Sequence, residues 1–235
     1  MPRRPRLVVP GVPHHVTQRG NNRQHVFFSD QDRTRYLYLL HQYAQKHDFR
    51  ILGWCLMTNH VHLIVIPGNK NSLALTLAQT HSQYSIELNR TRDRVGHLWH
   101  NRFFSCPLDS THLLNALRYV DLNPVRAGLT LHAKDWRWSS ARAHLSPIAP
   151  DALLDSSWTG WMNEARIGWD YFDWNTALAA VSPTTEWDRL RRATKLGEPF
   201  GSENFLSQLE TVTGRPLRVK PSGRPCFTKV IAAAS

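Results

Sequence analysis

The sequence predicts an α+β fold in which helices pack on an antiparallel sheet, followed by a mainly helical C-terminal extension. Over about the first 145 residues, short apolar runs of strand length alternate with longer segments whose apolar residues recur at helical spacing. Beyond residue 150 the chain becomes polar and rich in tryptophan, with helical character. The 235 residues are 41% hydrophobic and 20% charged, an ordinary globular composition in a chain long enough to bury a core.

The first elements are a strand and a helix. Residues 14–18 read as a short strand, and residues 19–23 that follow it form a basic segment of turn-forming type. Asp30 is in position to cap a helix over residues 31–47, where tyrosine and leucine recur at helical spacing. A basic loop is therefore expected between the first strand and the first helix.

A pair of strands, a helix and a further strand are expected next. Residues 50–57 and 60–66 are apolar runs separated by a short turn, which favours adjacent strands. Ser72 could cap a helix over residues 73–90. Residues 97–108 are expected to include the next strand.

The last element of the body is a helix that Ser110 could cap and that runs toward Asn123, where Pro124 helps to end it. The order is then strand, helix, two strands, helix, strand and helix. This is the order of a ferredoxin-like domain, in which helices pack on one sheet.

Charge divides the chain into three parts, with a linker-like Ser146-Pro147-Ile148-Ala149-Pro150 after the first. Residues 1–150 carry 19 basic and 8 acidic residues, whereas residues 151–210 carry 5 basic and 10 acidic ones. Residues 211–235 carry 5 basic residues and no acidic ones. We expect a domain over residues 1–145, a tryptophan-rich acidic helical region over 151–210, whose tryptophans anchor a small core, and a basic tail over 211–235.

The overall charge favours a polyanionic partner. A formal net charge of +11 points first to nucleic acid and second to an acidic membrane surface, although a merely soluble basic protein would also fit. No apolar run approaches the roughly 20 residues that span a bilayer, so no membrane insertion is expected. The three cysteines show no Cys-x-x-Cys spacing, so we expect neither disulfides nor a zinc-thiolate site, and a cytoplasmic location.

Two histidines form the first candidate site. His60 and His62 lie two apart in an apolar strand, so their side chains project from the same face while Val61 projects from the other. Two imidazoles on one rigid strand make half of a metal site. The alternative is a pair of structural histidines.

A second candidate site lies in residues 118–128. Tyr119 and Asn123 are four apart, and on a helix they share a face. A phenol can attack phosphorus, and an amide oxygen is a hard ligand that could help the histidines hold Mg²⁺ or Mn²⁺. The alternative for Tyr119 is an aromatic residue half-buried on an amphipathic helix.

Five motifs in order extend these observations along about the first 145 residues. They are HHVTQRGNNR at 14–23, CLMTNHVHLIV at 55–65, VGHLWHNRF at 95–103, RYVDLNPVRAGL at 118–129 and WRWSSARAHL at 136–145. With these motifs the chain resembles the REP-associated tyrosine transposases. These are relatives of the single-tyrosine insertion-sequence transposases, within the HUH endonuclease superfamily.

The resemblance implies a ferredoxin-like HUH endonuclease fold and a bacterial, nucleoid-associated enzyme that cleaves and rejoins hairpin-forming, single-stranded repeat DNA. By position, Tyr119 becomes the nucleophile, which stays joined to the 5′ end of the cleaved DNA. His60 and His62 become the paired ligands of Mg²⁺ or Mn²⁺. Asn123 stands where insertion-sequence relatives commonly have glutamine as the third ligand, and its side chain is one methylene shorter.

Basic and amide side chains beside the motifs and in the tail are candidates for DNA contacts. They are Arg19, Asn21, Asn22, Arg23, Arg102, Arg118, Arg126, Arg215, Arg218, Lys220 and Arg224. Trp99, Phe103 and Phe104 could stack on unpaired bases. Solvated arginines and core aromatics are the alternatives in each case.

Two other functions compete with this interpretation. Histidine-triad nucleotide hydrolases also carry alternating histidines in an apolar strand, but they need a third histidine where this chain has Ile64. A protein that binds palindromic DNA and has lost catalysis is the second alternative, against which His60, His62 and Tyr119 argue. The sequence leaves the choice between monomer and dimer open.

Overall fold

The computed structural model describes residues 5–146, 151–165, 174–180 and 184–218. In chain order the strands and helices are β1 (His14–Arg19), a 3₁₀ turn (Asn21–Arg23), α1 (Asp30–Lys46), β2 (Phe49–Leu56), β3 (His60–Pro67), α2 (Ser72–Thr91), β4 (Phe104–Pro107), α3 (Ser110–Asp121), α4 (Asn123–Arg126), a 3₁₀ turn (Ala133–Asp135), α5 (Ala141–Leu145), α6 (Trp158–Ala165), α7 (Trp174–Ala179), α8 (Thr184–Leu196) and α9 (Glu203–Thr213).

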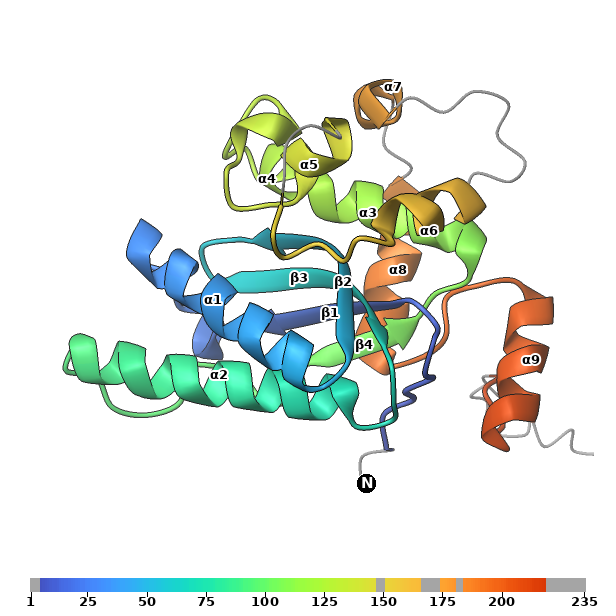
Figure 1. The fold of residues 1–235 in the computed structure, drawn as a ribbon, viewed down its shortest axis with the longest axis horizontal. Helices are drawn as coiled ribbons and strands as arrows, with labels where there is room; N and C mark the ends of the chain where they lie inside the picture. The colour runs from blue at the N-terminus through green and yellow to red at the C-terminus, as the bar shows by residue number, and fades with distance from the viewer. Residues whose placement is uncertain (1–4, 147–150, 166–173, 181–183, 219–235) are drawn as a thin grey trace, which may run out of the picture.

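The strands form one sheet in the order β2-β3-β1-β4, and every neighbouring pair is antiparallel. Helices α1 and α2 pack together on one face, and α3 and α8 lie on the other (Figure 1). The α+β class and the antiparallel sheet predicted from the sequence are therefore confirmed.

Alternation along β3 decides which side chains meet which helices. Val61, Leu63 and Val65 are buried in the cluster that includes the apolar residues of α1 and α2. Ile64 and Ile66 are buried in the other cluster, with the leucines of α3. Because side chains two apart share a face, the even-numbered positions of β3 face α3.

Helices α1 and α3 are each capped by a different residue from the one that the sequence predicts. Helix α1 is capped by Ser29, whose hydroxyl accepts from Asp32 N–H, so Asp30 is the first helical residue rather than the cap. Helix α3 is capped by Asp109, which accepts from His112 N–H, rather than by Ser110.

Asn123 also falls outside the helix in which the sequence placed it. Helix α3 ends at Asp121, Leu122 separates the two helices, and Asn123 begins α4 with Pro124 beside it. Proline lacks the N–H that a helix interior needs, but the first turn of a helix tolerates it. The proline therefore helps to start a new short helix instead of only ending the old one.

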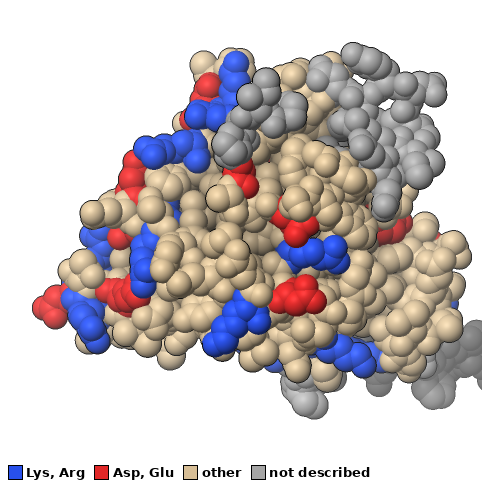
Figure 2. Space-filling view, viewed as in Figure 1, with Lys and Arg blue, Asp and Glu red and all other residues tan. Residues whose placement is uncertain are grey.

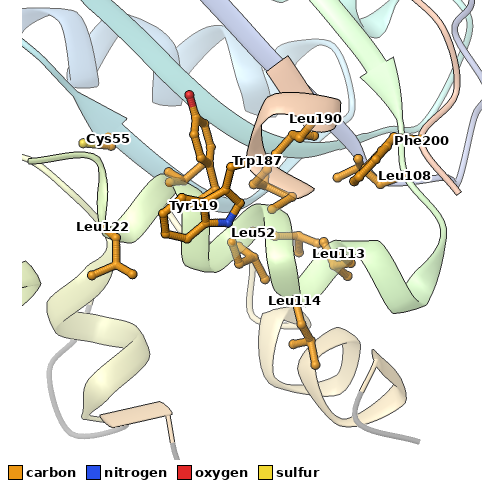
Figure 3. Close-up of a cluster of buried hydrophobic side chains, with 14 of the residues drawn as sticks. Leu52, Cys55, Leu108, Leu113, Leu114, Tyr119, Leu122, Trp187, Leu190 and Phe200 are labelled. Atoms are coloured by element: carbon orange, nitrogen blue, oxygen red, sulfur yellow. The ribbon is translucent and has the colours of Figure 1, made fainter. Parts of the chain in front are cut away.

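The C-terminal helices extend the core of the sheet domain. Helices α6, α7 and α8 each contact α3. Figure 3 shows Trp187 and Leu190 of α8 beside Tyr119 and the leucines of α3, and Trp174 is buried in the same cluster. Trp174 and Trp187, which were expected to anchor a small core, lie instead in the large cluster that α3 shares with residues of β2 and β3. Trp169 lies outside the described residues.

The face seen in Figure 2 has basic and acidic side chains intermixed over α1 and α2. Ion pairs also link α1 to α2 and to the residue after α2, as in Arg35 with Glu87 and Arg92 with Asp32. This face therefore has no continuous basic patch. Among the described residues, no helix combines the length and the hydropathy needed to cross a membrane.

Candidate active site

The face of the sheet that α3 covers brings the predicted residues together. In the antiparallel register, Arg19 of β1 lies opposite His60 of β3, and Thr17 lies opposite His62. Thr17 also lies opposite Phe104 of β4. Directly paired residues point to the same face, so these five side chains share the surface on which the apolar residues of α3 pack.

Tyr119 of α3 reaches this surface next to the two histidines. Its ring meets the His62 ring edge-on, with centroids 5.4 Å apart and an interplanar angle of 87°. The His60 and His62 centroids are 5.0 Å apart. The Tyr119 ring is buried, but its hydroxyl points away from the leucines of α3 and toward the strands in Figure 3. No described residue forms a hydrogen bond with that hydroxyl, so it is available for chemistry.

Each histidine is held through the same ring nitrogen. His60 Nδ1 lies 2.6 Å from Asn59 Oδ1, and His62 Nδ1 lies 3.0 Å from His15 Nε2. The Nε2 atom of each histidine has no hydrogen-bond partner among the described residues. Metal-binding histidines characteristically engage one ring nitrogen in this way and offer the other to the metal.

Burial keeps both imidazoles neutral at neutral pH. Burial, with a smaller contribution from the Arg19 charge, lowers the pKa of His60 to about 4. Burial also holds the pKa of His62 well below its ordinary value, aided by His60, His15, Arg19 and Arg126. The neutral imidazole is the form that binds metals, so the two residues fit the divalent metal implied by the sequence.

A third protein ligand would have to be something other than a histidine, cysteine or carboxylate. Within the described ranges, no cluster of three such side chains could hold a metal. The buried Asn123 donates from Nδ2 to the Tyr119 carbonyl oxygen over 3.2 Å, which links it to the candidate nucleophile. Its Oδ1 forms no hydrogen bond with the described residues and is the candidate third ligand.

Two of the predicted arginines flank the same place. Arg126 of α4 is exposed, and its guanidinium carbon lies 4.9 Å from the Tyr119 ring centroid and 4.7 Å from that of Trp187. Arg19 is also exposed, opposite His60 in the sheet. A phosphate placed at Tyr119 would therefore meet positive charge from two different elements.

Comparison with known proteins finds a family match over the segment that carries the candidate site. Residues 9–123, which include His60, His62, Tyr119 and Asn123, match the family model described as "Transposase IS200 like". This segment of the chain is therefore similar to that family. A Haemophilus influenzae protein assigned as a REP-associated tyrosine transposase is 29% identical over 110 residues, which cover 42% of this chain. The match spans only 62% of that relative's length.

Solved structures support the fold of this IS200-like chain. The structure of a REP-associated tyrosine transposase bound to a REP hairpin is similar, with a TM-score of 0.55 at 15% identity. The similarity covers 66% of this chain and 92% of that one. At this identity the likeness extends to the fold alone.

The loop before the first helix joins the IS200-like site through its backbone. Asn59 donates from Nδ2 to the Arg23 carbonyl oxygen over 3.0 Å, while its Oδ1 faces His60. Asn22 and Arg23 both have positive φ, 49° and 60°, and both are exposed. The predicted DNA contacts at Asn21, Asn22 and Arg23 therefore lie beside the candidate metal ligands.

The other predicted arginines are more distant or already engaged. Arg102 is exposed and lines a cleft of about 680 Å³ together with Phe104 and residues of α8 and the chain ends. Arg118 contacts the C-terminal extension, donating to the Ala180 carbonyl oxygen and lying over Trp187. Its position gives it a structural role that the sequence did not predict.

The basic tail is less free than its composition indicates. Arg215 donates to the carbonyl oxygens of Pro5 and Arg6. Arg218 forms ion pairs with Glu203 and Glu210, acidic residues just upstream of the tail. Lys220 and Arg224 lie outside the described residues.

Of the three aromatics expected to stack on bases, only Phe104 lies on the site face. Phe103 is buried on the other face, with the Arg6 guanidinium carbon 3.6 Å from its ring centroid. Trp99 packs against His81, with ring centroids 4.5 Å apart. These contacts favour the core alternative for Phe103 and Trp99.

Four residues of the site were not singled out from the sequence. They are His15, Asn59, Trp187 and Thr194. Asn59 directly precedes His60, and a search for hydrogen-bonding residues next to the His-x-His pair would have found it. Thr194 and Trp187 lie far along the chain and carry no comparable signal.

Proposed function

We propose that this protein is a single-stranded DNA endonuclease and strand transferase that cleaves and rejoins hairpin-forming repeat DNA through a covalent bond to Tyr119. The observation that carries the proposal is the position of the Tyr119 phenol, edge-on to His62 with His60 beside it. A histidine pair free at Nε2 next to an uncommitted tyrosine hydroxyl suits metal-assisted phosphoryl transfer better than a structural cluster does.

The covalent step conserves the energy of the phosphodiester. The Tyr119 oxygen attacks phosphorus, a tyrosine O–P bond forms, the P–O3′ bond breaks, and the phenol proton ends on the released 3′ oxygen. Rejoining is the reverse, with a 3′ hydroxyl attacking the phosphotyrosine. Because one phosphodiester bond replaces another, neither direction needs ATP.

The residues around Tyr119 divide the other tasks between them. His60 and His62 would hold Mg²⁺ or Mn²⁺ through Nε2, with Asn123 Oδ1 as the third protein ligand. Bound there, a cation would supply Lewis-acid polarisation of the scissile phosphate and offset the charge that develops on its oxygens. Arg126 and Arg19 are exposed on either side and in position to bind the DNA backbone.

Hairpin DNA is proposed as the substrate on two grounds. The related solved structure holds a REP hairpin, and the family segment of this chain covers the same candidate site. Exposed Asn22 and Arg23 beside His60 supply an amide that can read a base edge and a cation that can bind phosphate.

The test compares wild-type protein with Tyr119→Phe on labelled single-stranded hairpins taken from repeats that flank the gene. We expect a Mn²⁺-dependent protein–DNA adduct on denaturing gels with wild type and none with Tyr119→Phe. The free energy of unfolding of Tyr119→Phe should stay within about 0.5 kcal/mol of the wild-type value, because no described residue forms a hydrogen bond with the lost hydroxyl.

Tyr38→Phe is the matched control, since it removes an exposed hydroxyl from α1 on the opposite face of the sheet. It should form the adduct as wild type does. An adduct that persists in Tyr119→Phe would refute the assigned nucleophile. Tight hairpin binding without any adduct would instead identify a DNA-binding protein that has lost catalysis.

A further inference from the structure

A chain of hydrogen bonds runs from helix α8 to the candidate metal ligand His62. Thr194 Oγ1 lies 2.8 Å from the Leu190 carbonyl oxygen within α8. The same Oγ1 lies 2.7 Å from His15 Nδ1, and His15 Nε2 lies 3.0 Å from His62 Nδ1. Thr194, His15 and His62 are all at least 95% buried, so water does not compete for these bonds.

The direction of each bond follows from its donors and acceptors. The Leu190 carbonyl can only accept, so the Thr194 hydroxyl donates its single proton there, and its oxygen accepts from His15 Nδ1–H. The Cys106 thiol, 3.2 Å from the same oxygen, can donate weakly to its other lone pair.

The buried His15 ring has no carboxylate partner among the described residues, so it is neutral and its Nε2 is an acceptor. His62 must then donate from Nδ1. This leaves the Nε2 lone pair of His62 free.

We propose that Thr194 and His15 are positioning residues that fix His62 with its proton on Nδ1 and its Nε2 free to bind a divalent cation. The inference rests on the proposed function, and it makes α8 of the C-terminal extension a part of the metal centre. Thr194 is 179 residues from His15 in the chain, so only the folded extension can provide this contact.

The partner histidine is held in a matching way by a different element. Asn59 Nδ2 donates to the Arg23 carbonyl oxygen, which orients its Oδ1 as the acceptor for His60 Nδ1–H. Both candidate ligands therefore present Nε2. The same orientation, reached through unrelated partners, is what a shared cation between the two rings requires.

Thr194→Val makes the proposal testable, because valine has nearly the same shape and no hydroxyl. Without an acceptor for Nδ1–H, the His15 proton moves to Nε2 and is donated to His62 Nδ1. His62 must then carry its own proton on Nε2, the atom that would bind the cation. We expect Mn²⁺ affinity to fall about tenfold to a hundredfold, the usual effect of losing such a partner.

The measurements use the full-length protein and test the chain of hydrogen bonds without relying on catalysis. Long-range ¹H–¹⁵N spectra of metal-free protein report which nitrogen of His62 carries the proton, with signals assigned by His15→Gln and His62→Gln. Mn²⁺ titration then gives affinity, and hairpin binding in chelator shows whether the fold is intact. Thr194→Ser should restore both readings, because it returns the hydroxyl.

Thr80→Val is the matched control, since Thr80 is equally buried and its hydroxyl has no hydrogen-bond partner among the described residues. It should leave the His62 tautomer and Mn²⁺ affinity unchanged. A proton on Nε2 of His62 in wild type, or an unchanged His62 tautomer in Thr194→Val, would overturn the proposed positioning role of Thr194 and His15. Absence of Mn²⁺ binding to wild type would count against the proposed function. The His62 tautomer would still show whether Thr194 and His15 fix the position of its proton.

Discussion

A buried ion pair near Tyr119 gives the sharpest test of how the site is supported. Asp121, the last residue of α3, faces His144 of α5 with Oδ2 2.8 Å from Nδ1, and both side chains are fully buried. His144 Nε2 lies 2.9 Å from the Leu52 carbonyl oxygen, and Trp174 Nε1 donates to Asp121 over 2.9 Å. Since both His144 nitrogens face acceptors, both must donate, and the ring is an imidazolium paired with the carboxylate.

Asp121→Asn keeps the shape of the side chain and removes its charge. Breaking one partner of a buried pair leaves the other charge uncompensated, which costs about 3–5 kcal/mol. The matched control is Asp30→Asn, which makes the same chemical change in a side chain that is 62% exposed and paired with Arg137. An exposed pair contributes about 0–1 kcal/mol, so the control should change the free energy of unfolding by less than 1 kcal/mol.

The pH dependence of stability gives an independent check on this pair. Burial lowers the pKa of His144, but the Asp121 charge, hydrogen bonds to Asp121 and the Leu52 carbonyl, and the Asp151 charge outweigh it, so the pKa is raised. A raised pKa contributes stability that is fully present below the unfolded value near 6.5 and is lost as pH rises through the folded value. The difference between wild type and Asp121→Asn should therefore be largest below pH 6.5 and shrink at higher pH.

Urea unfolding followed by tryptophan fluorescence across this pH range measures both effects. A loss below 1 kcal/mol in Asp121→Asn, equal to that of the control, would refute the buried ion pair. So would a difference that grows as the pH rises, since that is the behaviour of a group with a depressed pKa.

The remaining predictions concern DNA binding, measured as hairpin affinity over a range of salt concentrations. Arg19→Gln and Arg126→Gln should each weaken binding and reduce the slope of log affinity against log salt by about 1, because each would remove one proposed phosphate contact. Arg218→Gln should leave the slope unchanged, because Glu203 and Glu210 already offset its charge. An unchanged slope in both site variants would argue against backbone contacts there, and a reduced slope in Arg218→Gln would show that its ion pairs open on DNA.

Much of the fold was predictable because periodicity is a local property. The apolar runs around His60 and His62 indicated a strand, and period-two alternation was enough to place both side chains on one face. The surroundings of that pair were not predictable in the same way. Placing Arg19 opposite His60 depends on the register between β1 and β3, and a slip of one residue would turn Arg19 to the other face.

Capping and tertiary contacts account for most of what the sequence missed. The observed caps, Ser29 and Asp109, each lie one residue before the predicted cap. Neighbouring residues with capping side chains made the two positions hard to tell apart. His15 looked like an ordinary strand residue, since its role depends on Thr194, which has no sequence relation to it. A single sequence carries no signal for a contact between segments so far apart.

The change in composition at residues 146–150 does not coincide with a break in the buried core. Charge and proline content change at residues 146–150, and that change predicted a domain boundary. The buried core crosses it, since Trp187 packs edge-on against Tyr119 with centroids 5.8 Å apart and Leu190 lies in the same cluster. The side chains of α8 pack around Tyr119, and Thr194 of α8 bonds His15, so removing this helix would alter both surroundings. Helix α8 of the acidic extension is therefore part of the same folded core as the candidate site.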